Sequence, residues 1–204
     1  MKIIAATQNQ GKLREFQRIL NPYGFTVISQ QEAGIDLDIE ETGQTFEENA
    51  CLKARAIYDR TGLPTLADDS GLAVDVLNGA PGIYSARYAN FCTGSLTEGN
   101  ADDTANYMLL LEQMKEVPEA ERTARFVCTL CYISADGEAH LFRGECEGKI
   151  GFHPSGSEGF GYDPIFYWQG RSFGELSGEE KDRISHRGQA LRMLEEYIQK
   201  HEHR

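Results

Sequence analysis

Strand-like and helical patterns alternate along the first half of the chain, and this alternation limits the folds that it can adopt. Residues 2–6 form a short apolar run, and the stretch from Lys12 to Leu20 then carries apolar side chains at helical spacing. A second strand is expected at residues 26–29. Because strands and helices interleave here, the pattern predicts an α/β fold.

Later elements extend this pattern. Strands are expected at residues 64–68 and 72–76, on either side of the sequence Asp68-Asp69-Ser70-Gly71. Residues 124–135 and 138–146 form a natural hairpin. Because a hairpin dominates the second half, we predict a mixed β-sheet flanked by helices.

Polar residues mark the starts of four further helices. Ser/Thr residues followed three positions later by Glu form capping boxes, and Ser or Asp also favours a helix start. The predicted starts are Thr45 with Glu48 before a helix to about Thr61, Asp102 and Asp103 before one to about Lys115, Ser177 with Glu180, and Ser185 before a final helix.

Length and charge restrict the classes of partner. The 204 residues carry a net charge of −12, and 40% of them are hydrophobic. We therefore expect residues 1–204 to form one domain in the cytosol, with no membrane span and no broad affinity for a nucleic-acid polymer. An anionic ligand would need a locally positive pocket.

The five cysteines do not form a pattern typical of disulfide-rich proteins. They stand at positions 51, 92, 128, 131 and 146, an odd number without regular spacing, which favours a reducing compartment. Cys128 and Cys131 lie in a predicted strand, where residues three apart point to opposite faces. We therefore expect buried thiols rather than a zinc or redox site.

A polar loop joins the first predicted strand to the first predicted helix: Thr7-Gln8-Asn9-Gln10-Gly11-Lys12. Backbone N–H groups at a helix N-terminus, with the Thr and Asn side chains and a Lys ammonium, suit a phosphate group. The spacing is not that of a Walker loop, and a well-capped helix alone would have the same pattern.

Two acidic pairs are candidate ligands for a hard cation. Magnesium is usually held by one or two carboxylates together with substrate phosphates, and Glu40-Glu41 and Asp68-Asp69 could provide them. A solvated acidic loop would also explain Glu40-Glu41. The pair Asp68-Asp69 is less easily explained that way, because it interrupts a stretch that would otherwise form core.

Two segments of the second half could contact a nucleobase. Residues 158–164 place Phe160 between glycines, in a loop that could present the ring for stacking, although a single Phe more often fills a core. Lys181 and the segment Ser185-His186-Arg187 bring cations near a helix N-terminus, which is electrostatically unfavourable without an anionic or electron-rich partner. Ordinary surface charge is the alternative.

Taken together, these segments resemble the inosine triphosphate pyrophosphatase family, the XTP/dITP diphosphatases. The resemblance extends over nearly the whole chain. Its motifs are Thr7-x-Asn9-x-x-Lys12, Glu40-Glu41-Thr42-Gly43, Thr45-Phe46-x-Glu48-Asn49-Ala50 with Lys53, Ala67 to Leu72, Gly79 to Tyr88, Gly159 to Pro164, and Ser185-His186-Arg187-Gly188.

The resemblance implies an elongated mixed sheet with two lobes around a central substrate cleft, a homodimer, and hydrolysis of ITP, dITP and XTP to the monophosphate and pyrophosphate. It implies a role for each matching residue. Thr7, Gln8, Asn9, Gln10, Gly11, Lys12 and Lys53 would hold the triphosphate, Glu40 and Asp69 would bind Mg²⁺, Asp69 would be the general base, Ser70 would touch the substrate, and Phe160, Gly161, Tyr162, Asp163, Lys181, His186 and Arg187 would line the base pocket.

Chemistry agrees with these roles. An ionised aspartate can accept a proton from the attacking water, and lysines stabilise charge developing on pyrophosphate. A 6-oxo purine offers an acceptor to Lys181, His186 or Arg187, whereas adenine offers an amino donor and would leave those donors unpaired. Guanine shares the 6-oxo group, so the rejection of GTP must depend on its 2-amino group.

Two other functions remain open at this point. A related pyrophosphatase acting on odd pyrimidine nucleotides could share the fold and the metal chemistry, but the segment His186-Arg187 favours a purine. A nucleotide sensor that binds without cleaving is expected to lack catalytic acids or phosphate lysines, and this chain has both.

Overall fold

The protein folds into two compact units, each made of segments distant in sequence. The computed structural model describes residues 1–94 and 99–201. The first unit contains residues 1–69, residues 128–144 and the chain from residue 184 onward, and the second contains residues 70–127 and 145–183. Strands β3, β4 and β5 each begin in one unit and end in the other.

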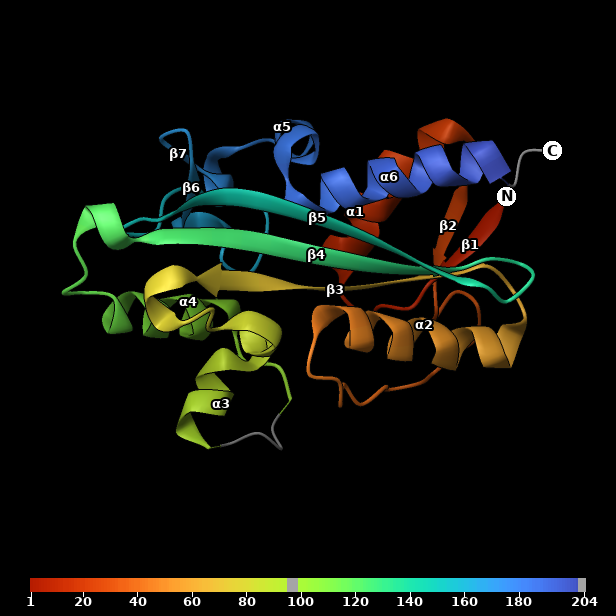
Figure 1. The fold of residues 1–204 in the computed structure, drawn as a ribbon, viewed down its shortest axis with the longest axis horizontal. Helices are drawn as coiled ribbons and strands as arrows, with labels where there is room; N and C mark the ends of the chain where they lie inside the picture. Colours follow the sequence, from red (N-terminus) through yellow and green to blue (C-terminus); the bar gives the residue numbers. More distant parts are fainter. Residues whose placement is uncertain (95–98, 202–204) are drawn as a thin grey trace. The chain divides into compact units, whose positions relative to one another are not determined.

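The strands form a mixed sheet, which confirms the predicted fold class (Figure 1). In the described part of the chain the sheet has seven strands, in the order β2-β1-β3-β4-β5-β6-β7. Strand β1 is parallel to β2 and β3, whereas β5, β6 and β7 pair antiparallel. Their bounds are β1 Lys2–Ala5, β2 Thr26–Ser29, β3 Thr65–Val74, β4 Thr123–Ile133, β5 Ala139–Ile150, β6 Phe166–Trp168 and β7 Arg171–Ser172.

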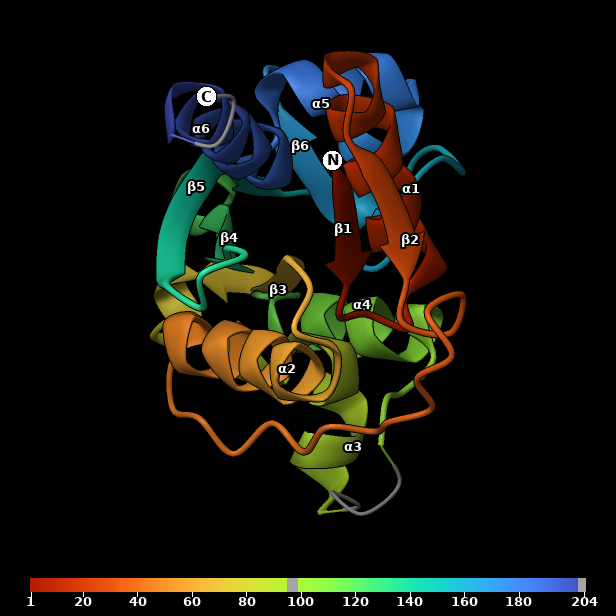
Figure 2. The same cartoon turned by 90° about the vertical axis from the view of Figure 1, so that its right-hand side faces the viewer.

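Helices cover both faces of the strands in the first unit. Helices α1 (Gln10–Leu20) and α6 (His186–His201) lie on one face, and α2 (Phe46–Thr61) lies on the other (Figures 1 and 2). Side chains alternate along each strand, so β1 contributes Ile3 to the core under α1 and α6 and Ile4 to the core under α2. This alternation therefore decides which helix each strand residue meets.

Cys128 and Cys131 follow this alternation. Cys128 belongs to the core under α1 and α6, and Cys131 belongs to the core under α2. Both thiols are buried, and all five cysteines are free. The expectation that this pair points to opposite faces is confirmed.

The predicted helix starts are largely confirmed. Thr45 caps α2 by accepting from the backbone N–H of Glu48, although the Glu48 carboxylate accepts from Gln44 rather than from Thr45. Asp102 caps α4 (Asp103–Gln113). The box of Ser177 and Glu180 is complete before α5 (Gly178–Ile184), and Ser185 accepts from the N–H of Gly188 in the first turn of α6.

One prediction about the strands is wrong. Residues 64–68 and 72–76 were expected as separate strands around Asp68-Asp69-Ser70-Gly71, but β3 runs without a break from Thr65 to Val74. The two acids do not break the strand, because cationic or amide side chains from the covering helices meet each carboxylate. Paired in this way, a carboxylate can be buried.

The second unit is built around aromatic rings. Phe126, Phe166 and Phe173 pack with ring centroids 4.5 to 5.7 Å apart. Arg122 is also buried, and its guanidinium donates to four backbone carbonyl groups, among them those of Met114 and Ile150. This unit also contains α3 (Tyr88–Thr93), α4 and most of α5.

Short 3-10 helices connect the elements, at Asn21–Tyr23, Asp75–Leu77, Gly82–Arg87, Glu119–Glu121, Asp163–Ile165 and Phe173–Glu175. No helix among residues 1–94 and 99–201 is long and apolar enough to span a membrane.

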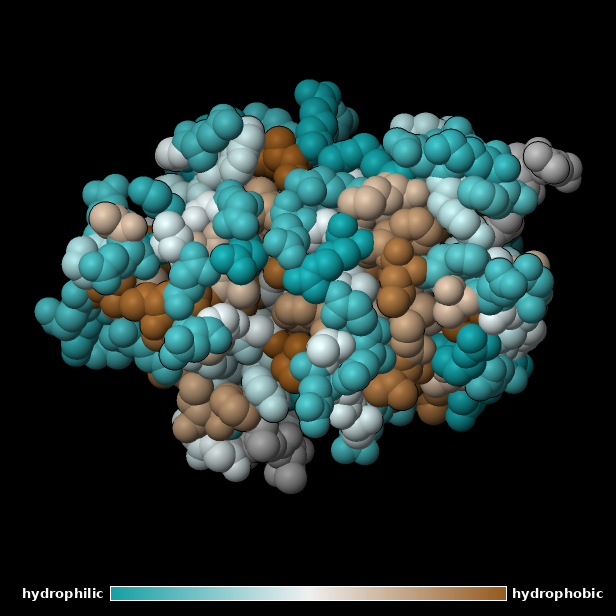
Figure 3. Space-filling model, in the orientation of Figure 1, coloured by the Kyte–Doolittle hydropathy of each residue, from teal (hydrophilic) through white to brown (hydrophobic). Residues whose placement is uncertain are grey.

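Apolar side chains are exposed over α2 and the β4–β5 hairpin (Figure 3). Leu52 and Leu141 contribute to this surface. A hollow of about 480 Å³ here is lined by Gly43, Glu48, Cys51, Leu52, Arg55, Cys131, Ile133 and Ala139. Its lining is mainly apolar, so it does not suit a triphosphate, which needs several cationic or N–H donors.

Candidate active site

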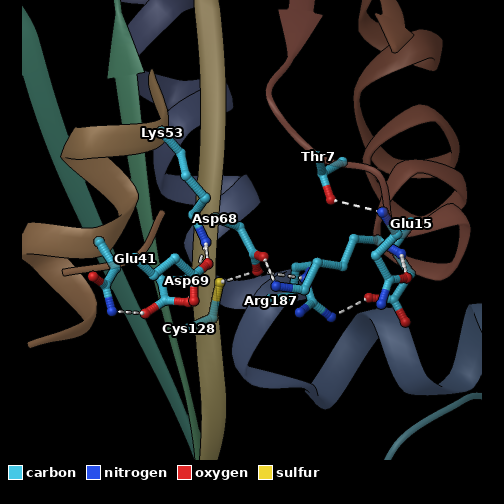
Figure 4. Close-up of polar contacts among 11 residues, drawn as sticks. Thr7, Glu15, Glu41, Lys53, Asp68, Asp69, Cys128 and Arg187 are labelled. Atoms are coloured by element: carbon cyan, nitrogen blue, oxygen red, sulfur yellow. Dashed lines mark hydrogen bonds and ion pairs between the residues drawn. The ribbon is translucent and has the colours of Figure 1, made fainter. Parts of the chain in front are cut away.

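Asp69 is held from one face of helix α2. Its Oδ2 accepts a hydrogen bond from Asn49 Nδ2 at 3.1 Å, and its Oδ1 lies 3.2 Å from Lys53 Nζ. Asn49 and Lys53 are four residues apart, so they lie on the same face of the helix, one turn from each other. Each oxygen of the Asp69 carboxylate therefore has its own donor (Figure 4).

The loop before α2 contributes a second carboxylate. Glu41 Oε1 lies 2.5 Å from Lys53 Nζ, so one ammonium group joins Glu41 and Asp69. Glu40, the predicted metal ligand, is exposed and makes no hydrogen bond or ion pair with any residue that the structure describes. The contacts thus bring Glu41 to Asp69 and leave the Glu40 carboxylate in solvent.

The charged neighbours of Asp69 do not cancel the effect of its burial. Burial raises the pKa of Asp69, and Glu41 and Asp68 add to this shift. Lys53 and Lys12 oppose it without reversing it, so the carboxyl group ends with a raised pKa. The pKa of Lys53 is raised as well, because Asp69 and Glu41 outweigh the effect of its burial. Because the pKa of Asp69 stays raised beside Lys53, a bound cation would stabilise its ionised form.

Asp68 points to the opposite face of β3 and forms a different network. It pairs with Lys12, the last residue of the polar loop, and its Oδ2 accepts from Arg187 Nε at 2.9 Å. Arg187 Nη1 in turn lies 2.5 Å from Glu15 Oε2. The Cys128 thiol donates to Asp68 Oδ2 at 3.3 Å. Figure 4 shows Asp68 and Asp69 extending to opposite sides of the strand.

The network around Asp68 is balanced in charge. Two cations, Lys12 and Arg187, face two carboxylates, Asp68 and Glu15. Burial is the largest single influence and would raise the pKa of Asp68, but Arg187, Lys12 and Lys53 together outweigh it and hold the pKa well below its usual value. Burial would likewise lower the pKa of Arg187, but Asp68 and Glu15 raise it. Asp68 therefore stays ionised, and its ion pairs with two cations make it less suited than Asp69 to binding a metal ion.

The polar loop is ordered by its own side chains. Asn9 caps α1, its Oδ1 accepting from the N–H of Lys12 at 3.1 Å, and Thr7 Oγ1 accepts from the N–H of Asn9 at 3.1 Å. Gln8 and Gln10 are exposed, whereas Gly11 is buried. The loop thus presents the N-terminus of an 11-residue helix with one lysine beside it.

The residues predicted for base recognition lie partly in the second unit. Lys181 Nζ is 2.6 Å from Asp163 Oδ2 and 4.7 Å from the centre of the Phe160 ring. Asp163 Oδ2 also accepts from the Phe160 N–H at 2.9 Å. Gly159 has φ +79°, and a Cβ there would fall 2.0 Å from Asp163 Oδ2. Glycine is therefore required at this position.

Other predicted residues have structural contacts. Tyr162 is buried and donates through its hydroxyl group to the carbonyl oxygen of Ser85 at 2.9 Å, and burial raises its pKa. The N–H of Gly161 donates to Asp103 Oδ2 at 2.7 Å. Ser70 follows Asp69 on β3 and is half-buried. Tyr162 and Gly161 are thus anchors of the aromatic loop.

His186 and Arg187 begin helix α6 in the first unit, and both are buried. The guanidinium of Arg187 is directed at Asp68 and Glu15. A Cβ on Gly144 of β5 would lie 2.1 Å from the carbonyl oxygen of His186. Glycine at position 144 therefore allows the start of this helix to approach the strand closely.

The donor set around Asp69 fits magnesium bound together with a substrate. No group of three or more His, Cys, Asp or Glu side chains within the described ranges could hold a metal ion alone. Magnesium does not need such a group, because it keeps several waters and binds through one or two carboxylates plus phosphate oxygens. Asp69 supplies one carboxylate of that kind and Glu41 is joined to it through Lys53, whereas Glu40, on the same loop, is exposed to solvent.

Sequence reasoning assigned no role to three residues of these networks. Asn49 belongs to the motif Thr45-Phe46-x-Glu48-Asn49-Ala50 and stands four residues before Lys53. This spacing indicates that the two side chains lie on the same face of a helix. Glu15 stands three residues after Lys12 on the same helix. Cys128 could not have been found in this way, because its contact with Asp68 joins two strands.

Comparisons with known proteins show the family of this chain. A family model described as the Ham1 family matches residues 3–197. The chain is 49% identical over 197 residues to the dITP/XTP pyrophosphatases of Photorhabdus laumondii and Escherichia coli strain K12, covering 95% of each protein.

Solved structures show the same fold. The Ham1 protein of Staphylococcus aureus is 40% identical, with a TM-score of 0.82 and 98% of this chain and 99% of that chain covered. A nucleoside-triphosphatase, or dITP/XTP pyrophosphatase, of Mycobacterium abscessus is 43% identical, with a TM-score of 0.72 and coverage of 95% and 98%.

Proposed function

Because the chain belongs to the Ham1 family, we infer that it is a nucleoside triphosphate pyrophosphatase. It hydrolyses non-canonical purine nucleoside triphosphates such as dITP, ITP and XTP to the monophosphate and pyrophosphate. This activity removes deaminated purines from the nucleotide pool before a polymerase can incorporate them.

We propose that Asp69 is the catalytic base and, with Glu40, holds Mg²⁺. A bound magnesium ion would neutralise phosphate charge and orient the anhydride for cleavage. Asp69 is suited to both tasks because its two oxygens have separate donors, which leaves further acceptor sites on each. Ionised Asp69 accepts a proton from the attacking water.

The observation that carries this proposal is the charge imbalance around Asp69. Lys53 contacts both Asp69 and Glu41 with one ammonium group, whereas the neighbouring Asp68 contacts two cations, Lys12 and Arg187. Of the two adjacent aspartates, only Asp69 therefore remains suited to binding a cation and accepting a proton.

We propose that the triphosphate binds to the loop from Thr7 to Lys12 and to Lys53. The loop offers N–H groups at the positive end of α1, together with an ammonium group. Lys53 now contacts two carboxylates, and a phosphate oxygen would compete for the same ammonium group. Ser70, which follows the base directly on β3, would touch the substrate.

For the base, we propose recognition of the 6-oxo group by Lys181, on a surface formed by Phe160, Gly161, Tyr162 and Asp163. An ammonium group has three donors, so Lys181 can keep Asp163 and still donate to a purine oxygen. Adenine would present an amino group to this donor. His186 and Arg187 are the remaining residues that the resemblance assigns to the base, but both are buried in the first unit and the guanidinium of Arg187 contacts Asp68 and Glu15.

The test is a product assay with dITP, XTP, GTP, ATP and dTTP, in magnesium and in a chelator. We expect magnesium-dependent release of pyrophosphate from dITP and XTP, and little from GTP or ATP. Orthophosphate as the first product would contradict the reaction, and a preference for dTTP would contradict the assignment of a purine site.

We also propose that the protein acts as a cytosolic homodimer without a nucleic-acid or membrane partner. The segment from Ala80 to Tyr88 is the proposed interface. Tyr84 of this segment stacks on Phe91 with centroids 3.9 Å apart, and the Phe91 side chain is 38% exposed. Light scattering of the purified chain would give its mass directly, and a monomer would contradict this proposal.

A further inference from the structure

We propose that Asn49 is a positioning residue that fixes the orientation of the Asp69 carboxylate and ties it to the loop before α2. This inference rests on the catalytic role proposed for Asp69. The Asn49 side chain is fully buried, and both of its polar atoms are used.

The partners of Asn49 fix which way its amide points. The backbone N–H of Gly43 can only donate, and it lies 2.8 Å from Asn49 Oδ1. The NH₂ group must then face Asp69 Oδ2, which as a carboxylate oxygen can only accept. Asn49 is therefore a directed link between the loop and the base rather than a polar group with interchangeable ends.

The contacts form a closed ring. Asp69 accepts from Asn49, and Asn49 accepts from the backbone N–H of Gly43 on the loop before α2. Two residues earlier on that loop, Glu41 pairs with Lys53. Lys53 also contacts Asp69, which closes the ring. Glu41 and Gly43 are thus both fastened to one face of α2. Since Glu40 precedes them directly, the ring also limits where the second proposed metal ligand can lie.

Asn49 contributes stiffness that Lys53 cannot. A lysine ammonium ends a flexible stem and has three rotatable donors, so it attracts the carboxylate without setting its plane. The Asn49 amide is planar, short and held at its other end by backbone. Gly43 makes this close approach available, because a Cβ there would lie 2.6 Å from Asn49 Oδ1.

The experiment compares Asn49→Asp, Asn49→Ala and a matched control, Asn106→Asp. Asp at position 49 keeps an acceptor for Gly43 but replaces the donor to Asp69 with a like charge; Ala removes both contacts. Asn106 is also a buried asparagine, and its amide hydrogen-bonds to the backbone of Ala86 and Ala89. The control therefore reports the cost of placing a carboxylate in a buried amide site.

Three quantities are measured for each variant: kcat and KM for dITP with magnesium, the dissociation constant of the uncleavable α,β-imido analogue of dITP by calorimetry, and the melting temperature. Misplacing a catalytic group by about 1 Å costs on the order of 100-fold in rate. We expect kcat to fall roughly 100-fold in Asn49→Asp and at least about 10-fold in Asn49→Ala. The analogue should bind both variants within about threefold of the parent, and Asn106→Asp should keep the parent kcat.

Two results would overturn the proposal. A parent-like kcat in Asn49→Asp would show that the amide donor does not orient the base, and a loss confined to analogue affinity and KM would make Asn49 a substrate-binding residue. If Asn49→Asp does not fold, Asn49→Ala decides by the same criteria. Asp69→Asn separates this inference from the proposed function: a fully active Asp69→Asn protein would remove the base itself, whereas an inactive one beside a normal Asn49→Asp would reject only the role of Asn49.

Discussion

Asp68 and Asp69 are adjacent in sequence and chemically identical, yet the two faces of β3 give them opposite environments. Asp68 faces α1 and α6, where Lys12 and Arg187 compensate it fully. Asp69 faces α2, where Lys53 is shared with Glu41. The pKa of Asp68 is lowered and that of Asp69 is raised, although burial acts on both in the same direction.

Burial alone therefore does not decide whether a carboxylate is suited to binding a cation. Both aspartates are at least 95% buried. What distinguishes them is the number of cations that each face supplies, which leaves one carboxylate in a structural ion network and the other able to bind a further cation. Three substitutions test this contrast.

The largest effect is expected for Asp69→Asn. Loss of a general base alone typically costs about 10²- to 10⁴-fold, and we expect pyrophosphate release from dITP to fall at least about 10³-fold because a proposed metal ligand is lost as well. The assay is the initial rate at saturating magnesium. Activity within tenfold of the parent would remove the distinction between the two acids.

In a chelator, Asp69→Asn should be at least as stable as the parent protein. The raised pKa means that charged Asp69 costs folding free energy above its folded pKa, and that this cost is relieved as the pH falls through that pKa. A neutral Asn removes the cost, so we expect a higher free energy of unfolding at pH 7. A large decrease would contradict the inferred charge imbalance.

Asp68→Asn should have the opposite effect on stability. Removing one member of a buried ion network leaves cations uncompensated, and we expect a loss of about 3–5 kcal/mol in the free energy of unfolding at pH 7, measured by urea titration. Arg187 and Lys12 are the groups left without this carboxylate.

This loss should depend on pH. Because the pKa of Asp68 is lowered on folding, its stabilising contribution is complete above the unfolded value of 3.8 and decreases as the pH falls below it. The difference between the parent and Asp68→Asn should therefore shrink in acid. A difference that is constant from pH 7 to pH 3 would show that the lost stability is not electrostatic.

The smallest effect is expected for a pair on the surface of the same unit. Arg143 Nη1 lies 2.6 Å from Glu47 Oε1, but the side chains are 46% and 34% exposed. Exposed pairs contribute about 0–1 kcal/mol, so Arg143→Ala should lower the free energy of unfolding by less than about 1 kcal/mol. A loss comparable with that of Asp68→Asn would mean that burial is not what separates the two pairs.

Local signals predicted much of the fold. Caps at Asn9 and Thr45 depend on contacts within four residues, and the apolar spacing of α1 depends on one helix face. The polar loop from Thr7 to Lys12 and the acidic pairs were likewise visible as motifs. The break expected at Asp68-Asp69 was wrong because charge was judged without the cations that arrive from α1, α2 and α6.

The sequence by itself determined the α/β class, the helix starts and the family, because these depend on spacing and on short motifs that are read along the chain. Only the tertiary structure decided which aspartate is compensated. Alternation along a strand places neighbouring residues on opposite faces, but the partners on each face come from positions as distant as Lys12 and Arg187. The electrostatic environment of a buried group is the sum over such neighbours, and it exists only after the chain has folded.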